Sequence, residues 1–208
     1  MPTSAALALF DFDGTITAQE TMPEFVRRSI STQRLRLAQI CLTPVVLANR
    51  CGLASSILVR RTLVLSCYRG ASAGHLETVG LAFAREYLPN VLRDNAMRRI
   101  AWHKAQGHTV AVVSGALDFY LAPWCKEHQL DPICSSLEQR DGILSGRYLG
   151  AQCVREEKAR QVRARYETSR YSTIYAYGDS PDDIGLLGVA TKRYYRWQEV
   201  DAQQDAGV

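Results

Sequence analysis

The sequence lacks the features of a disordered, repetitive or fibrous protein. It has only 14 glycines and 7 prolines among 208 residues, and no internal repeat or low-complexity linker interrupts it. That composition excludes collagen-like repeats and low-complexity scaffolds. Hydrophobic residues make up 47% of the chain and charged residues 22%, which is ordinary for a folded protein with a buried core. The length fits one large domain, or one domain that carries an inserted subdomain.

A strong charge of either sign is also missing. Lys and Arg number 25 and Asp and Glu 21, which leaves a formal net charge of +4. No basic run is long enough to serve as a nucleic-acid-binding arm, so we expect no nucleic-acid partner. The first eight residues carry no basic segment, and the apolar run that follows leads directly into acidic residues. We therefore expect no secretory signal.

The cysteines and histidines show no metal-binding or disulfide pattern. No CxxC spacing occurs, and no cysteine pairs with a histidine at the interval of metal ligands. A chain of this length does not need disulfides to fold, so we expect reduced, mostly buried thiols in a cytoplasmic protein. The cysteines are Cys41, Cys51, Cys67, Cys125, Cys134 and Cys153. The scattered histidines, which we interpret as structural, are His75, His103, His108 and His128.

Short apolar runs alternate with helical segments along much of the chain. Strands are predicted over residues 5–10, 108–113, 131–135, 172–177 and 191–195. Helices are predicted over residues 90–106, around Pro123, over residues 155–166 and, as a short helix, before the last strand. The dipeptide Asp141-Gly142 predicts a hairpin within residues 137–149. This alternation predicts a parallel sheet with right-handed crossovers.

The segment between the first strand and the helix over residues 90–106 is too long for a simple crossover. Its pattern is helical: Thr17 and Glu20 have the spacing of a capping box, as do Thr21 and Glu24, and Pro23 suits a first helical turn. We therefore predict an inserted helical cap over residues 18–88. The core domain would comprise residues 1–17 and 89–208.

Polar clusters follow three of the predicted strands. They are Asp11, Asp13 and Thr15; Ser114 and Gly115; and Asp179, Asp182 and Asp183. Because ligands of open α/β sheets bind beyond the carboxyl ends of the strands, we expect these clusters to meet at one rim. Carboxylates crowded in this way are stable around a hard cation such as Mg²⁺, and Lys158 can supply compensating charge. Together with hydroxyl and backbone N–H groups, they would form a phosphate cradle.

In the same order along the chain, these pieces resemble the four motifs of the haloacid dehalogenase superfamily of phosphohydrolases. Motif one resembles residues 11–15 (DFDGT), motif two residues 113–115 (VSG), motif three Lys158, and motif four residues 178–183 (GDSPDD). The helical insertion between motifs one and two is similar to the small C1-type cap of the phosphoserine-phosphatase-like branch, subfamily IB. The resemblance covers nearly the whole chain. It implies a Rossmannoid parallel sheet flanked by helices, with an inserted helical cap.

The resemblance also implies catalytic roles. Asp11 would be the nucleophile that forms an aspartyl-phosphate, and Asp13 would act as general acid and then as general base. Phosphoryl oxygens would be bound by Thr15, Ser114, Gly115 and Lys158. The Mg²⁺ ligands would be Asp11, the backbone carbonyl of Asp13, Asp179 and, directly or through water, Asp183. The family often has Asn, in contact with substrate, at the position of Asp182, so which of Asp182 and Asp183 supports the metal stays open.

Substrate-binding residues are less clearly marked. In phosphoserine phosphatases a Glu just after motif one contacts the substrate amino group, and Glu20 occupies the matching place, although it also fits the capping box with Thr17. Arg60 and Arg61 lie where the family's cap supplies an Arg for the substrate carboxylate, although an adjacent Arg pair on a helix is usually exposed. We expect Trp197 to cover the sheet edge, unless the loop after motif four reaches the site.

The function that we predict is Mg²⁺-dependent hydrolysis of a small phosphorylated metabolite, with phosphoserine as the family's nearest guess. The alternatives are a lipid or membrane-proximal phosphate, as in phosphatidylglycerophosphatases, transfer of the phosphoryl group to an alcohol, and a non-catalytic phosphometabolite-binding module. The intact Asp11 and Asp13 argue against the last of these.

Residues 37–59 form a long apolar segment whose only charge is Arg50. Its length is near that of a membrane span, but Pro44, Asn49, Arg50 and Gly52 favour a turn between two short helices. A small cap cannot bury all of this apolar surface. We therefore expect the excess to cover the active-site mouth, a homodimer partner or a membrane surface.

Overall fold

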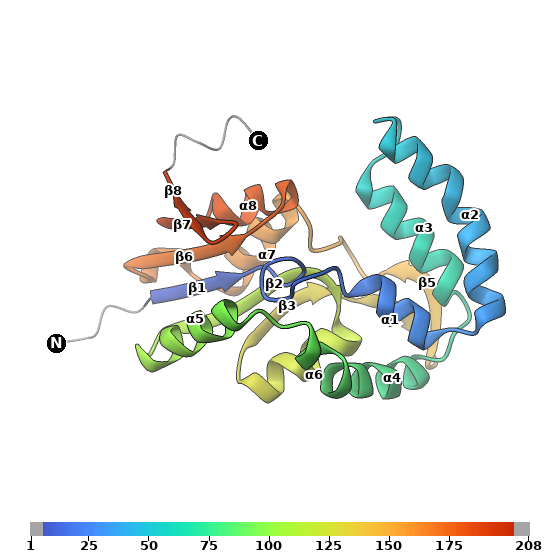
Figure 1. Cartoon of the computed structure of the whole chain (residues 1–208), viewed down its shortest axis with the longest axis horizontal. Helices are drawn as coiled ribbons and strands as arrows, with labels where there is room; N and C mark the ends of the chain where they lie inside the picture. Colours follow the sequence, from blue (N-terminus) through green and yellow to red (C-terminus); the bar gives the residue numbers. More distant parts are fainter. Residues whose placement is uncertain (1–5, 202–208) are drawn as a thin grey trace.

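The computed structural model describes residues 6–201 and shows a six-stranded sheet between two layers of helices (Figure 1). The strands of this sheet lie in the order β3-β2-β1-β6-β7-β8, and only β8 runs antiparallel to its neighbour. Their bounds are β1 Ala6–Phe10, β2 Thr109–Leu117, β3 Asp131–Ser135, β6 Thr173–Gly178, β7 Lys192–Tyr195 and β8 Gln198–Val200. The predicted α/β class, with a mostly parallel sheet flanked by helices, is confirmed.

Helices occupy most of the remaining chain. The α-helices are α1 Met22–Ser29, α2 Thr32–Arg50, α3 Ser56–Tyr68, α4 Ala73–Glu86, α5 Asp94–Ala105, α6 Asp118–His128, α7 Glu156–Arg165 and α8 Ile184–Leu187. Short 3₁₀ turns are η1 Leu88–Asn90, η2 Thr168–Arg170 and η3 Pro181–Asp183. A separate hairpin is formed by β4 Leu137–Arg140 and β5 Ile143–Tyr148. Its turn contains the predicted Asp141 and Gly142, both with positive φ, as a tight two-residue turn requires.

The central strand β1 explains why the sheet has two cores. Successive side chains of a strand point to opposite faces, so Leu7 and Leu9 pack on one side while Ala8 and Phe10 pack on the other. The first pair lies among residues of α7 and α8, and the second among residues of α5 and α6. Both faces are covered, as parallel sheets require.

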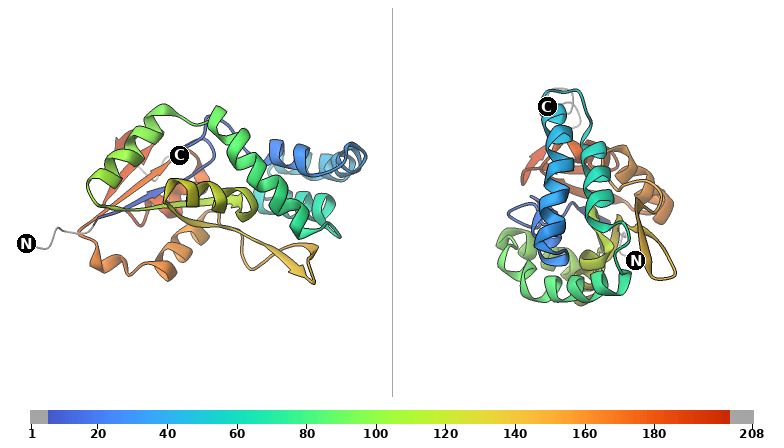
Figure 2. Two further views of the ribbon diagram at one scale, coloured as in Figure 1. Left: turned by 90° about the horizontal axis from the view of Figure 1, so that it is seen from below. Right: turned by 90° about the vertical axis from the view of Figure 1, so that its right-hand side faces the viewer.

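The predicted turn within residues 37–59 is confirmed. Helices α2 and α3 pack side by side as a hairpin whose turn contains Gly52, with a φ of +74°, and whose end points away from the body of the molecule (Figures 1 and 2). Pro44 lies inside α2. Among residues 6–201, no helix is both long enough and apolar enough to cross a membrane.

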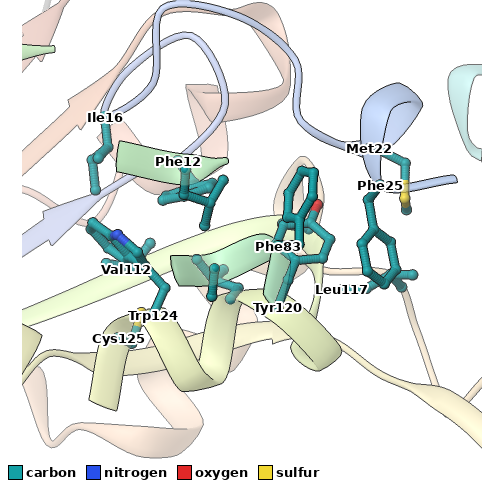
Figure 3. Close-up of a cluster of buried hydrophobic side chains, with 14 of the residues drawn as sticks. Phe12, Ile16, Met22, Phe25, Phe83, Val112, Leu117, Tyr120, Trp124 and Cys125 are labelled. Atoms are coloured by element: carbon teal, nitrogen blue, oxygen red, sulfur yellow. The ribbon is translucent and has the colours of Figure 1, made fainter. Parts of the chain in front are cut away.

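The base of the helical insertion shares a core with the sheet. Phe25 of α1 lies 5.4 Å from Phe83 of α4 and 4.7 Å from Tyr120 of α6, measured between ring centroids (Figure 3). Val64, Cys67 and Tyr68 of α3 belong to the same apolar cluster. The division into a core and a cap at residues 18–88 stays a prediction.

Both predicted capping boxes are wrong. The first helix begins at Met22, so Thr17 and Glu20 precede it, and the Thr17 hydroxyl donates instead to the backbone oxygens of Phe12 and Gln19. Thr21 is the residue before α1 but makes no side-chain cap. Glu24 forms ion pairs with arginines one turn further along α1.

Several boundaries also differ. Strand β2 continues to Leu117 instead of ending at residue 113, with a register irregularity between Ser114 and Leu117. Helix α5 begins at Asp94, because residues 88–90 form a 3₁₀ turn. Strand β8 was not predicted, and Ala5, the first residue of the predicted first strand, lies outside the described residues. Of the cysteines, Cys41 and Cys51 are exposed, against the expectation of mostly buried thiols, while the others are buried or half-buried.

Candidate active site

The loop after β1 turns back immediately beneath the loop after β6. Gly14 has a φ of +81°, and a Cβ at this position would lie 2.3 Å from Oδ2 of Asp179. The position therefore requires glycine both for its backbone conformation and for the close approach of a carboxylate. The Thr15 hydroxyl donates to Oδ1 of Asp179 at 3.3 Å. The first and last polar clusters of the sequence thus meet, as expected.

Lys158 joins these clusters from helix α7. Its buried ammonium group lies 2.5 Å from Oδ1 of Asp11 and 2.6 Å from Oδ1 of Asp183. Burial alone would lower the pKa of Lys158, but the two carboxylates raise it above its usual value. Burial raises the pKa of Asp11 well above its usual value, and the neighbouring Lys158 opposes this shift. Lys158 therefore stays charged and offsets the crowded carboxylates.

Asp182 and Asp183 have different surroundings. Oδ2 of the fully buried Asp183 accepts hydrogen bonds from the backbone N–H groups of Asp179 and Ser180 and from the Ser180 hydroxyl, each at 3.1 Å. Asp182 instead pairs with Arg155 at 2.9 Å, and Arg155 also donates to Ser56 of α3. Asp182 therefore belongs to a polar link between the sheet rim and the helical hairpin.

Three carboxylates form a group that could hold a metal ion. One oxygen each of Asp11, Asp179 and Asp183 lies within 4.8 Å of the other two. Burial and the charge of Asp183 raise the pKa of Asp179 above its usual value, so the carboxylates repel one another. A donor set of carboxylate oxygens suits a hard divalent cation, and a bound cation would relieve this repulsion. The side chain of Asp13 lies outside this group.

Asp13 is buried and is held by the residue before helix α1. Its Oδ1 accepts from the backbone N–H of Thr21 at 3.0 Å and from the Thr21 hydroxyl at 2.6 Å. That hydroxyl also lies 3.0 Å from the hydroxyl of Tyr120. Burial, with the charge of Glu20, raises the pKa of Asp13 to about 6, although the bonds from Thr21 and the charge of Arg60 oppose the shift. A carboxyl group with this pKa can donate and accept a proton near neutral pH.

Ser114 and Gly115 lie in the irregular end of β2. The buried Ser114 accepts a hydrogen bond from the backbone N–H of Ala116 at 3.1 Å. Gly115 faces the hairpin, because a Cβ there would lie 2.8 Å from Nη1 of Arg60 and 2.8 Å from Val154. Arg60 therefore extends from α3 over the sheet rim.

The candidate substrate-binding residues Glu20, Arg60 and Arg61 differ in their position relative to the site. The charges of Glu20 and Arg60 both act on the pKa of Asp13, and Arg60 reaches over Gly115, whereas Arg61 is exposed. Near Arg60, Tyr148 buries a hydroxyl oxygen that has no hydrogen-bond partner within residues 6–201. The same holds for Oε1 of Gln152, whose amide nitrogen donates to the backbone oxygen of Ile57 in α3.

Some residues that support the site could not be recognised from the sequence. Arg93 donates from Nε to the backbone oxygens of Gly14 and Thr17, each at 3.1 Å, and Arg196 donates to that of Asp179 at 3.1 Å. Their partners are backbone atoms, which leave no side-chain pattern. Thr21 has the spacing of a capping box, but its backbone N–H and hydroxyl bind Asp13 instead.

The remaining predicted residues pack in the core or at its edge. The Phe12 ring is buried in the core and lies 5.1 Å from Trp124. Trp197, in the turn between β7 and β8, lies 5.5 Å from Tyr177 of the interior strand β6, so it packs on a face of the sheet instead of covering its edge. Each histidine has a hydrogen-bond partner: Ser29 for His75, Trp124 for His128, and each other for His103 and His108.

Known proteins are similar in sequence over the part of the chain that forms this site. The sequence model of the family described as haloacid dehalogenase-like hydrolase matches residues 8–188. Protein CicA of Caulobacter vibrioides is 28% identical over 201 residues, which cover 91% of this chain and 85% of that protein. Phosphoserine phosphatase SerB2 of Mycobacterium tuberculosis is 29% identical over 188 residues, which cover 88% of this chain and only 42% of that protein.

Solved structures share the fold. A protein of unknown function from Bordetella pertussis superposes with a TM-score of 0.75 at 21% identity, covering 93% of this chain and 90% of that one. A phosphoserine phosphatase with a phospho-aspartyl intermediate analogue superposes with a TM-score of 0.66 at 21% identity, covering 92% and 86%.

Proposed function

The chain belongs to the haloacid dehalogenase-like hydrolase family, which confirms the predicted class of enzyme, a phosphatase similar to phosphoserine phosphatases. From this premise we propose that it hydrolyses a small phosphomonoester through an aspartyl-phosphate, with Mg²⁺ as cofactor. The observation that carries the proposal is the pairing of two unlike carboxyl groups two residues apart. Asp11 is bound to Lys158, whereas Asp13 is bound to Thr21 and has a pKa of about 6.

Asp11 supplies the nucleophile in the first step. A carboxylate oxygen of Asp11 forms a bond to phosphorus while the bond from phosphorus to the ester oxygen breaks. The protonated Asp13 gives its proton to the departing alkoxide, which leaves as an alcohol. Lys158, already beside Asp11, balances negative charge on the phosphoryl group, together with the backbone and hydroxyl groups of Thr15 and Ser114.

Water completes the cycle. Asp13, now ionised, takes a proton from a water molecule that attacks phosphorus, and the bond between phosphorus and Asp11 breaks. Phosphate is released and Asp11 is again a carboxylate. The two hydrogen bonds from Thr21 hold the same oxygen of Asp13 in place in both steps. If an alcohol replaced water, the same groups would transfer the phosphoryl group instead.

Mg²⁺ would be held by Asp11, Asp179 and Asp183, whose oxygens form the acidic group described above. When bound, it supplies positive charge to the phosphoryl oxygens and to the attacking carboxylate. Asp183 also orients the backbone of Asp179 and fixes Lys158, so its role extends beyond the metal. Asp182, paired with Arg155, is not part of this ligand set.

A substrate with both a positive and a negative group fits the mouth of the site. Glu20 and Arg60 carry opposite charges near Asp13, as needed for the amino and carboxylate groups of phosphoserine. Tyr148, near Arg60, carries a buried hydroxyl without a hydrogen-bond partner among the described residues. We therefore propose phosphoserine as the leading substrate. We also propose a cytoplasmic setting, because the six cysteines are free thiols.

The test is phosphate release from a panel of phosphorylated metabolites, including phosphoserine and phospholipid head-group phosphates, with Mg²⁺ and with chelator. Phosphoserine should be hydrolysed with Mg²⁺, and the activity should vanish with chelator. An alcohol added to the assay separates transfer from hydrolysis. Absence of turnover on the whole panel by folded, Mg²⁺-binding protein would overturn the proposal.

Adjacent arginines supply a matched test of the substrate class. Arg60→Ala should raise KM for phosphoserine at least about ten-fold while changing KM for p-nitrophenyl phosphate little, because only phosphoserine carries a carboxylate. Arg61→Ala removes the same charge from an exposed position and should change neither value. Equal effects on both substrates would exclude a carboxylate-binding role for Arg60.

A further inference from the structure

Helix α2 presents a continuous apolar stripe to solvent. Leu37, Ile40, Cys41, Pro44 and Leu47, with Cys51 directly after the helix, are all exposed, and intervals of three and four residues between them place them on one face. The exposed fractions are large, 59% for Leu37, 71% for Ile40 and 54% for Leu47. Leu53, in the turn that follows, is 84% exposed. The stripe therefore runs along α2 into the tip of the hairpin.

This stripe is not used by the fold. Ala38, on the opposite face of α2, is the buried residue of this helix, and α2 packs along α3. Arg34 fixes α2 to α3 by donating to the backbone oxygens of Ser66 and Arg69. The active-site mouth is contacted from α3, through Arg60 and Ser56, so the stripe does not cover it. Of the occupants expected from the sequence, a partner copy and a membrane surface remain.

The charge of the hairpin distinguishes these two occupants. Between Glu24 and Glu77 the sequence contains eight arginines and no Asp, Glu or Lys. Because the formal net charge of the whole chain is only +4, the rest of the chain is net negative. Arg36 and Arg50 are exposed on the same helix as the stripe. A symmetric dimer through this face would place arginines of both copies together, without acidic partners on the hairpin.

We propose that the α2–α3 hairpin docks on the surface of an anionic phospholipid bilayer, with the stripe and Leu53 entering the headgroup region. Apolar side chains beside arginines are the combination that binds such an interface. No spanning segment is needed, in agreement with the absence of a membrane-crossing helix among the described residues. The hairpin projects from the body (Figure 2), so it can reach a surface while the sheet stays in water.

Vesicle co-sedimentation tests the proposal independently of catalysis. The protein should bind vesicles of phosphatidylcholine and phosphatidylglycerol at least about ten-fold more tightly than vesicles of phosphatidylcholine alone, and salt should weaken the binding. The double variant Ile40→Ser/Leu47→Ser should lose most of it. The matched control is Ile143→Ser/Leu149→Ser, on or next to the β4–β5 hairpin, where the side chains are 49% and 64% exposed. This control should bind like the unchanged protein.

The arginines have a matched control as well. Arg36→Gln/Arg50→Gln should weaken binding to anionic vesicles, whereas Arg140→Gln/Arg163→Gln, with the same change in net charge, should weaken it much less. A polarity-sensitive thiol dye reports insertion directly. Cys41 and Cys51 are the exposed cysteines, while Cys67, Cys125 and Cys153 are buried, so the dye should label the stripe and shift to the blue with anionic vesicles.

Three results would overturn the proposal. They are protein that stays in solution with anionic vesicles, binding that falls equally in the stripe variant and its control, and a dimer in light scattering that the stripe variant dissociates while vesicles are ignored. The last result would assign the stripe to a second copy of the chain.

Discussion

Thr21 donates two hydrogen bonds to a single oxygen of Asp13, one from its backbone N–H at 3.0 Å and one from its hydroxyl at 2.6 Å. Its position directly before helix α1 suggested a helix cap, but its side chain serves the site instead. The start of α1 therefore positions the carboxyl group that we assign as acid and base.

Thr21→Val should lower kcat about ten-fold or more, because it removes the hydroxyl bond but keeps the shape of the side chain. Both bonds from Thr21 lower the pKa of Asp13, so the variant should move the pH profile of kcat to higher pH. The direction is the same for an acid and for a base role. Thr78→Val, on the exposed face of α4, is the control. An unshifted profile would leave Thr21 with a structural role only.

Asp11→Asn should reduce turnover by several orders of magnitude while the fold is kept, because the nucleophile is lost in an isosteric change. Burial raises the pKa of Asp11, so its ionised form is disfavoured by the site. In chelator, the melting temperature of the variant should therefore equal or exceed that of the unchanged protein. More than a tenth of the activity remaining would exclude Asp11 as nucleophile.

Beryllium fluoride, which mimics a phosphoryl group on a carboxylate, should raise the melting temperature only when Mg²⁺ is present. A ligand that binds the folded state alone stabilises it, and the carboxylates would repel the anion without a cation. Calorimetry with Mg²⁺, with chelator and with Asp11→Asn separates these cases. An equal shift with and without Mg²⁺ would contradict the acidic group as a metal site.

The rim of the sheet could be predicted from the sequence because strand ends converge in a parallel sheet. Asp11 and Asp179 each follow a short apolar strand, and topology alone then brings them together. The choice between Asp182 and Asp183 could not be predicted. It depends on which carboxylate points inward toward Lys158, and adjacent acids of similar spacing give no sign of that.

Local patterns failed where other contacts use the same side chains. The spacing of Thr21 and Glu24 is typical of a capping box, yet the Thr21 hydroxyl donates to Asp13 in the preceding loop, and Glu24 pairs with arginines of α1 itself. Arg93 contacts the backbone of Gly14 across 79 residues, a relation without any sequence signature. The sequence predicts surplus apolar surface in residues 37–59. Which side of α2 is exposed depends on how α2 packs against α3, and the sequence alone does not show that packing.

Gly14→Ala should abolish measurable turnover. The new Cβ would meet Asp179 at 2.3 Å, and the backbone would be strained at a φ of +81°. Gly150→Ala separates the two effects, because Gly150 has a φ of +74° and nothing within 4 Å of its Cβ position. Both variants should lose about 1 kcal/mol of stability from the backbone, but only Gly14→Ala should lose activity, at least about 100-fold. Similar activities would show that Asp179 can move without consequence.

His103 should make the fold less stable as the pH falls. It is fully buried between His108 and Tyr177, at 2.8 Å and 2.9 Å, and burial together with the charge of His108 lowers its pKa to about 3. An unfolded chain has the ordinary histidine pKa of about 6.5, so between these values only the unfolded state binds this proton. The free energy of unfolding should therefore fall with decreasing pH in that range, by at most about 1.4 kcal/mol per pH unit from this group. Above a pH of about 6.5 this group should contribute no pH dependence.

Urea unfolding at a series of pH values measures the slope. His103→Gln should be less stable at neutral pH but should have a shallower slope below pH of about 6.5, whereas the same change at exposed His75 should leave the contribution of His103 intact. Identical slopes in His103→Gln and the unchanged protein would exclude His103 as the source.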